Sequence, residues 1–136
     1  MNESRSVEET LAAGDVRDLI GVWDDFNSAE TWREVAAKTA GTEHAVTSAR
    51  ALAQLPETTA LDALRANVRA VDLLTARRWY VMKSAREAGA TWSQIGEALG
   101  ITKQAAHDFY RRKIEEQETY VPDLHDAAGA RAVLED

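Results

Sequence analysis

The sequence predicts an all-α fold, a small helical domain without strands. Apolar residues recur at intervals of three and four along most of the chain, and no stretch alternates between apolar and polar residues as a half-buried strand does. The two prolines, Pro56 and Pro122, both stand between such helical segments. Candidate N-cap residues precede the apolar runs, and glycines follow several of them. Together these observations favour helices connected by short turns.

The N-terminal part begins with signals for two helices. Ser6 and Glu9 have the spacing of a capping box, in which each side chain accepts a hydrogen bond from a free backbone N–H. A short helix is therefore expected from this point to Gly14, because helices often end on a left-handed glycine. Asp15 is a candidate cap for a second helix. The apolar positions of that helix are Val16, Leu19, Ile20, Trp23 and Phe26.

Two further helices are expected before Pro56. Asn27 or Ser28 is a candidate cap for the third, and Gly41 followed by Thr42 separates it from the fourth. Their apolar positions are Trp32, Val35, Ala36, Val46, Ala49, Leu52 and Leu55. Residues 1–57 are thus interpreted as an acidic N-terminal helical region.

A long helical segment is predicted over residues 58–89. Its apolar positions follow intervals of three and four and are Leu61, Leu64, Val68, Val71, Leu74, Val81 and Ala85. The pattern resembles a heptad repeat but lasts barely two repeats, so a core helix is expected, with a dimerisation helix as the alternative. A break near Arg77 or Arg78 is a further possibility and would begin a separate helix at Trp79.

The segment with the most specific pattern is residues 91–112, TWSQIGEALGITKQAAHDFYRR. Thr91 and Gln94 have capping-box spacing, which predicts the start of a short helix. Gly100 suits the left-handed end of that helix, and Thr102 is a candidate cap for a second one. The apolar or small residues expected between the two helices are Trp92, Ile95, Gly96, Leu99, Ile101, Ala106 and Phe109. Small residues at 96 and 106 would let the helices cross closely, and Ile101 is expected to fill the turn.

This segment resembles the helix-turn-helix of bacterial DNA-binding regulators in the run WSQIGEALGITKQAA. It is most similar to the small actinobacterial type and to the promoter-binding helix-turn-helix of sigma factors. The resemblance implies a C-terminal helix-turn-helix within a DNA-binding unit at residues 58–118, followed by a C-terminal tail or short helix at 119–136. It also implies a sequence-specific DNA-binding protein, a transcription regulator that places the helix from Thr102 to Arg112 in the major groove.

The positions that packing leaves free indicate how this helix would contact DNA. Gln104 can bind adenine bidentately, and Lys103 can reach guanine or a phosphate. Other candidates are hydroxyls at helix N-termini, an outward-facing histidine and two arginines placed for the DNA backbone. The DNA-binding candidates are Thr91, Ser93, Thr102, Lys103, Gln104, His107, Arg111 and Arg112. Asp108 can accept from a cytosine amino group, but a salt bridge with Arg111 or Arg112 is favoured.

Charge is distributed unevenly along the chain. The total of −7 is unfavourable for a protein that must neutralise phosphates. Residues 77–113, however, hold eight basic and three acidic side chains, a local net charge of +5. The other 99 residues hold eight basic and 20 acidic side chains, a net charge of −12. Positive charge therefore coincides with the segment expected to contact DNA, and the acidic remainder is expected to limit indiscriminate binding.

Composition and motifs disfavour several other classes. The chain lacks cysteine, and its histidines, His44, His107 and His125, lie on separate segments without a second ligand at metal-binding spacing. No phosphate-binding loop or nucleophile motif occurs, so neither an enzyme nor a cofactor is expected. No apolar stretch is long enough for a membrane helix, and the N-terminus lacks a signal-peptide pattern, so a cytoplasmic protein is expected.

The expected partner is double-stranded DNA. One such helix contacts only a few base pairs, so a homodimer on a two-fold site is expected, with contacts from the N-terminal helices or from residues 61–74. The alternative is a protein–protein adapter that binds RNA polymerase, a sigma factor or another regulator through a reused helix-turn-helix and acidic N-terminal helices.

A weak internal repeat relates residues 31–46 to residues 91–106. The identical pairs at this offset are Thr31 and Thr91, Trp32 and Trp92, Thr42 and Thr102, and Ala45 and Ala105. A second, degenerate helix-turn-helix is one interpretation of the repeat. Glu43 stands where the C-terminal copy has Lys103, so DNA contact by the first copy is disfavoured.

Overall fold

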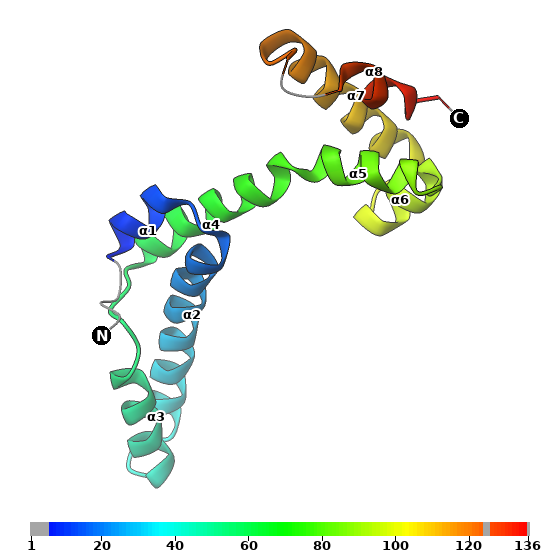
Figure 1. The fold of residues 1–136 in the computed structure, drawn as a ribbon. Coiled ribbons are helices and arrows are strands. Elements are labelled where there is room, and N and C mark those ends of the chain that lie inside the picture. Colours follow the sequence, from blue (N-terminus) through cyan, green and yellow to red (C-terminus); the bar gives the residue numbers. More distant parts are fainter. Residues whose placement is uncertain (1–5, 124–125, 136) are drawn as a thin grey trace. The chain divides into compact units, whose positions relative to one another are not determined.

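The computed structural model describes residues 6–123 and 126–135, and every regular element in these ranges is an α-helix. The predicted all-α fold is confirmed. The chain divides into two compact units, residues 1–75 and 76–136 (Figure 1). This boundary lies inside the expected DNA-binding unit of residues 58–118. The long helical segment predicted over residues 58–89 is not one helix, because one helix ends at Ala76 and the next begins at Arg78.

The N-terminal unit begins with α1 (Val7–Ala13) and α2 (Val16–Lys38). The backbone N–H of Glu9 donates to Ser6 Oγ at 3.2 Å, and the backbone N–H of Ser6 donates to Glu9 Oε2 at 3.1 Å. Gly14 follows with a left-handed φ of 67°, and the side chain of Asp15 caps α2. The first two helices therefore begin at the predicted residues.

The expected helix start at Asn27 or Ser28 is wrong, because α2 continues through both residues to Lys38. The Asn27 Nδ2 amide donates to the carbonyl of Trp23 at 2.9 Å, so this side chain bonds back along the helix and does not cap a new one. Thr31 likewise lies inside α2, where its hydroxyl donates to the carbonyl of Asn27 at 3.0 Å. The first copy of the internal repeat therefore lacks the helix start that Thr91 provides in the second.

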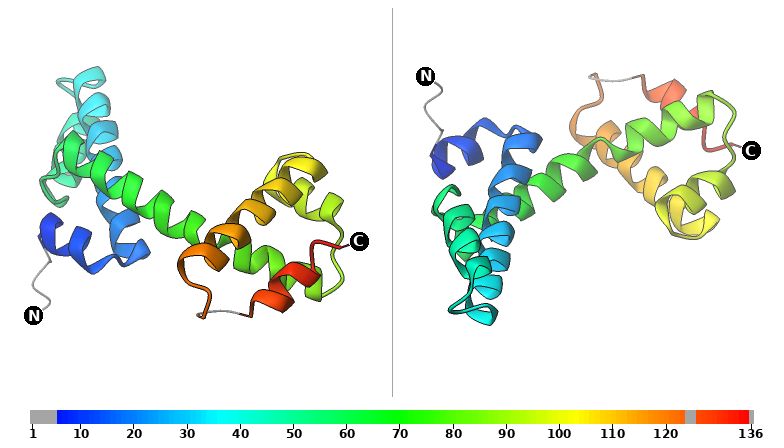
Figure 2. Two further views of the ribbon diagram at one scale, coloured as in Figure 1. Left: turned by 90° about the horizontal axis from the view of Figure 1, so that it is seen from above. Right: turned by 90° about the horizontal axis from the view of Figure 1, so that it is seen from below.

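After α2 the chain turns at Gly41, which has a φ of 81°, into α3 (Glu43–Ala53). The two helices lie side by side in Figure 1 and in both views of Figure 2. Thr42 immediately precedes α3 but makes no side-chain cap; its hydroxyl donates to the carbonyl of Thr39 at 2.6 Å.

The last helix of this unit, α4 (Ala60–Ala76), buries a different face from the one that the sequence predicts. Its buried residues are Ala63, Ala66 and Ala70, and the last two pack with Leu19 of α2. The predicted core positions Leu61, Leu64, Val68, Val71 and Leu74 are between 52% and 64% exposed. The side of α4 that faces Leu19 therefore carries small residues. The expected core helix is therefore wrong for these five positions.

The C-terminal unit contains α5 (Arg78–Glu87), α6 (Trp92–Leu99), α7 (Lys103–Tyr120) and α8 (Ala127–Ala132). Its core consists of Trp79, Met82, Trp92, Ile95, Ala106, Tyr110, Ile114 and Ala130. Helix α7 continues well past Lys113, and α8 packs against it through Ala130, which is fully buried. The C-terminal segment is thus a packed helix over residues 127–132. Leu124 and His125 lie outside the described residues.

In the described ranges no helix is long and apolar enough to cross a membrane.

Candidate nucleic-acid interface

Helix α6 begins and ends as its sequence predicts. The backbone N–H of Gln94 donates to Thr91 Oγ1 at 3.1 Å, and the backbone N–H of Thr91 donates to Gln94 Oε1 at 2.9 Å. At the other end Gly100 adopts a left-handed φ of 69°, and its N–H bonds to carbonyls of the last turn. A capping box thus pairs the N–H groups of Thr91 and Gln94 at the start of this eight-residue helix, and Gly100 pairs with carbonyls at its end.

Gly96 is where α6 meets the turn that leads into α7. A Cβ on this residue would lie 2.9 Å from the carbonyl oxygen of Ile101 and 3.0 Å from the carbonyl group of Thr102. Those contacts are to backbone atoms, which cannot rotate away as a flexible side chain can. The backbone N–H of Ile101 also donates to the carbonyl of Gly96 at 2.9 Å. Close approach of the turn to α6 therefore requires glycine at this position.

The turn itself differs from expectation in one residue. The side chain of Ile101 is 42% exposed and does not fill the turn. The backbone of Ile101, rather than its side chain, packs against α6 at Gly96. Thr102 then caps α7 as predicted, since its Oγ1 accepts from the backbone N–H of Ala105 at 3.0 Å.

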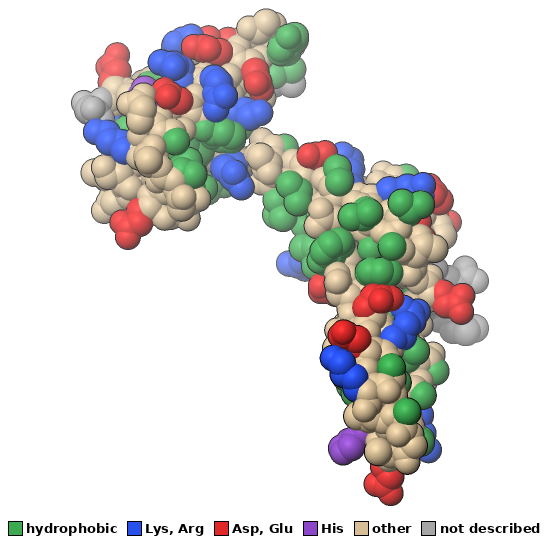
Figure 3. Space-filling view, turned by 180° about the vertical axis from the view of Figure 1, so that it is seen from behind, with side chains coloured by type: hydrophobic (Ala, Val, Ile, Leu, Met, Phe, Trp, Pro, Cys, Tyr) green, Lys and Arg blue, Asp and Glu red, His purple; other side chains and the backbone are tan. Residues whose placement is uncertain are grey.

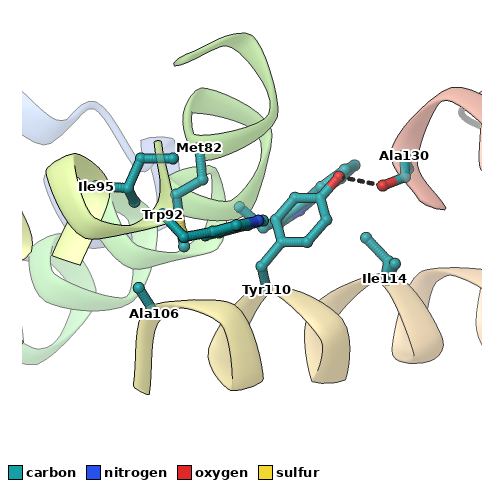
Figure 4. Packing of buried hydrophobic residues seen from close by; sticks show 8 residues of the cluster. Met82, Trp92, Ile95, Ala106, Tyr110, Ile114 and Ala130 are labelled. Carbon is teal, nitrogen blue, oxygen red and sulfur yellow. Dashed lines mark hydrogen bonds between the residues drawn. The ribbon is translucent and has the colours of Figure 1, made fainter. Parts of the chain in front are cut away.

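Aromatic packing orients α7 against α6, as the close view in Figure 4 shows for the labelled residues. The ring centroids of Trp92 and Tyr110 are 5.4 Å apart, and Ala106 is fully buried beside them. The Tyr110 hydroxyl donates to the carbonyl of Ala130 at 2.6 Å. Burial raises the pKa of the Tyr110 phenol to about 12. With this face packed inward, the opposite face of α7 is turned to solvent.

The exposed end of α7 carries the predicted contact residues. Thr102, Lys103 and Gln104 are exposed, and the first turn of the helix has no acidic residue. Thr91 and Ser93 are exposed at the start of α6. Free N–H groups at a helix N-terminus carry partial positive charge and favour an anion there. This end of α7 therefore combines polar exposed side chains with a positive potential.

One carboxylate connects the exposed side chains further along α7. Asp108 Oδ1 accepts from Gln104 Nε2 at 2.9 Å and from an Arg111 guanidinium nitrogen at 3.2 Å. The favoured salt bridge of Asp108 with Arg111 is thus present. Arg112 is exposed and donates from Nε to the backbone carbonyl of Asp108 at 3.4 Å. These residues form a connected polar row on α7: Gln104, Asp108, Arg111 and Arg112.

His107 does not face outward as expected. Its ring lies edge-on to Trp92 with centroids 5.2 Å apart, and its Nε2 is 3.1 Å from the carbonyl oxygen of Leu134. The side chain is half-buried. His107 therefore contacts the C-terminal segment, which the local sequence of α7 does not reveal because the partner is 27 residues away.

Two further basic residues contact Phe109 of α7: Arg78 of α5, which the sequence patterns missed, and Lys113 of α7, which the sequence places with Arg111 and Arg112 for contact with the DNA backbone. The guanidinium of Arg78 lies 5.9 Å from the centre of the Phe109 ring, and the ammonium of Lys113 lies 5.8 Å from the same ring. Each cation makes a cation–π contact with this ring. The sequence signal for Arg78 is the clustering of basic residues between positions 77 and 113.

No group of three or more potential ligands (His, Cys, Asp or Glu) that could hold a metal ion occurs among the residues that the structure describes. Comparisons of the chain with protein-family models, with curated proteins and with solved structures give no match. The function of this surface must therefore be inferred from its own geometry and chemistry.

Proposed function

We propose that this chain is a sequence-specific DNA-binding protein, a bacterial transcription regulator, in which α6 and α7 form a helix-turn-helix. The observation that carries the proposal is the exposed, acid-free first turn of α7, which follows the turn that approaches α6 closely at Gly96. A helix held in this way can enter the major groove with its N-terminal residues first. The segmental net charge of +5 over residues 77–113 supports contact with phosphates.

In this proposal the exposed residues have separate roles. Lys103 and Gln104 contact base edges, because they stand in the first turn of α7. Thr91, Ser93 and Thr102 bind phosphate oxygens through hydroxyls and nearby backbone N–H groups. Arg111 and Arg112 lie two turns further along and contact the DNA backbone. Without DNA, the Gln104 amide donates to Asp108. To contact a base, the amide must break this hydrogen bond and form one with the base instead.

We propose a cytoplasmic, non-enzymatic protein that needs no cofactor. One α7 helix spans only a few base pairs, so two copies are proposed to bind a site with two-fold symmetry.

The proposal is tested by selecting bound fragments from random DNA and then measuring their affinity across a salt series. A steep fall in affinity with salt is expected, because phosphate contacts release counterions. Replacing Lys103 and Gln104 together by alanine should abolish sequence preference. Arg111→Ala should weaken binding to all sequences alike and reduce the salt slope by about one unit.

A matched control separates local contact from overall charge. Lys38→Ala removes one positive charge from an exposed side chain of α2, which also pairs with Glu34 at 3.8 Å. This variant should bind DNA as the wild type does. If no fragment binds at low salt, the DNA-binding proposal is wrong, and the adapter hypothesis, with RNA polymerase or a sigma factor as partner, becomes the better one.

A further inference from the structure

The exposed apolar side of α4 has no covering segment in the described structure. We call Leu61, Leu64, Val68, Val71 and Leu74 the α4 face; each is more than half exposed. Three of these residues line a groove of about 530 Å³ together with Leu11 of α1. Figure 3 shows hydrophobic side chains gathered on the surface of this unit that is turned to the viewer. An apolar row at helical spacing is suited to pairing with another helix.

The area of the α4 face agrees with a protein interface. Its five side chains leave on the order of 500 Å² of apolar surface in water, at the upper end for a monomer. A stable interface buries about 800 Å² on each partner, of which the apolar centre is a part. The charged side chains Arg65, Arg69 and Asp72, which border the groove, supply a polar rim.

The charges beside the α4 face fit a second copy of the same helix. Arg65 and Asp72 are seven residues apart, so they lie on one flank of α4, two turns from each other. If two α4 helices run antiparallel about an axis beside Val68, Arg65 of each copy lies opposite Asp72 of the other. The same arrangement brings Leu64 near Val71 and Leu61 near Leu74. In a parallel two-fold pair, this flank of the two copies would lie on opposite sides of the interface, so Arg65 would not meet Asp72 of the other copy.

We propose that the chain forms a homodimer in which the α4 faces of two copies pack antiparallel about a two-fold axis at Val68. Apolar contact contributes most of the binding free energy, and two Arg65–Asp72 pairs set the direction of the helices. The inference goes beyond the DNA-binding proposal and does not rest on it. Self-association is measured without DNA, so either proposal can fail while the other stands.

The first test places a charge on the proposed axis. Val68→Glu brings two carboxylates together at the symmetry axis, and the dimer dissociation constant should rise at least about tenfold. Val46→Glu is the matched control, because Val46 is 53% exposed on α3 and lies outside the α4 face. Sedimentation equilibrium should give a dimer for the wild type and for Val46→Glu. A wild type that stays monomeric throughout the micromolar range, or a Val68→Glu dimer of unchanged affinity, overturns the proposal.

The second test concerns the direction of the helices. Asp72→Arg and Arg65→Asp should each weaken the dimer by several-fold, because each places like charges opposite one another. The double variant restores opposite charges and should regain most of the affinity. Arg65 also pairs with Asp62 at 3.4 Å and Glu8 at 3.9 Å within its own chain, so circular dichroism checks that the helices are retained. A folded double variant that remains as weak as the single variants overturns the antiparallel arrangement.

Discussion

Gly96 determines how closely the turn before α7 can approach α6. The added methyl group of Gly96→Ala would lie 2.9 Å from the carbonyl oxygen of Ile101, so the turn must move. We expect the unfolding free energy to fall by about 1–3 kcal/mol, as in other overpacked sites. Urea denaturation followed by circular dichroism measures the change.

Gly21 provides a matched control for this substitution. It also lies inside a helix, but a Cβ there meets no atom within 4 Å. Gly21→Ala should therefore stabilise the protein by up to about 1 kcal/mol, because alanine favours the helix over the unfolded chain. Equal effects of the two substitutions would contradict the close crossing at Gly96.

The raised pKa of Tyr110 predicts that the free energy of unfolding falls at alkaline pH. Its pKa is raised from 10.0 to about 12 in the folded protein. The phenol of the unfolded chain thus ionises first, and stability is complete below pH 10 and falls as pH rises toward 12. Each unit of pKa difference corresponds to about 1.4 kcal/mol, so a decrease of roughly 2 kcal/mol is expected across this window.

Comparison with Tyr110→Phe isolates this contribution. The substitution removes the phenol and its hydrogen bond to the carbonyl of Ala130. At neutral pH it should cost about 1–2 kcal/mol, because the carbonyl is left unpaired in a buried site. Between pH 10 and 12 its stability should fall less than that of the wild type. Parallel curves for the two proteins over this range would show that Tyr110 ionises freely in the folded state.

At the scale of elements, Arg86 of α5 joins the C-terminal segment to the rest of its unit. Its guanidinium donates to the carbonyls of Val133 at 3.0 Å, Glu135 at 2.7 Å and Ala90 at 3.0 Å. It also lies 5.4 Å from the centre of the Trp92 ring. A single side chain thus satisfies carbonyls before α6 and after α8.

Replacing Arg86 by glutamine should release the segment around residues 133–135. The planar guanidinium is the group that reaches three carbonyls at once, and an amide cannot reproduce that fork. Hydrogen exchange in α8 should become faster by at least about tenfold, while α2 should keep its protection. Arg50→Gln, at an exposed position of α3, is the control and should leave both helices unchanged. Unaltered exchange in α8 would mean that Ala130 packing alone holds the segment.

Helix ends were predictable from sequence where a side chain caps the backbone locally. Ser6, Asp15, Thr91 and Thr102 all cap the helices that they precede. The expected start at Asn27 failed because the same amide can also bond to a carbonyl four residues back within a continuous helix. Local pattern cannot decide between these two partners, since both lie within one turn of the residue.

The buried face of α4 was not predictable from hydrophobicity. A periodic row of leucine and valine normally marks the core side of a helix. In α4 that row is exposed and alanines are buried, because Ala66 and Ala70 lie against Leu19 of another helix. Tertiary packing sets this outcome. The exposed end of α7 was predictable from sequence, whereas the contact of His107 with Leu134 was not, because it joins distant parts of the chain.

At the scale of the whole molecule, the two proposed activities fall in different compact units. The α4 face lies within residues 1–75, and the proposed DNA-binding residues lie within residues 76–136. The charges divide similarly, since the stretch with a net charge of +5 belongs to the second unit. Variants of the α4 face should therefore leave the DNA-contacting residues themselves unchanged, and a monomeric protein should still bind a half-site, but weakly.

Alanine scanning would give a misleading account of α4. The large side chains of this helix are on its exposed side, so truncating Leu64 or Val68 removes little from the folded core. Apart from Leu73, which packs against the cluster around Leu19, the residues that hold the helix in place are already alanine and have nothing left to truncate. Such a scan would score the helix as tolerant of change over most of its length. Its packed side would be revealed by enlargement, with leucine at Ala66 or Ala70, where each added methylene has to displace a neighbouring helix.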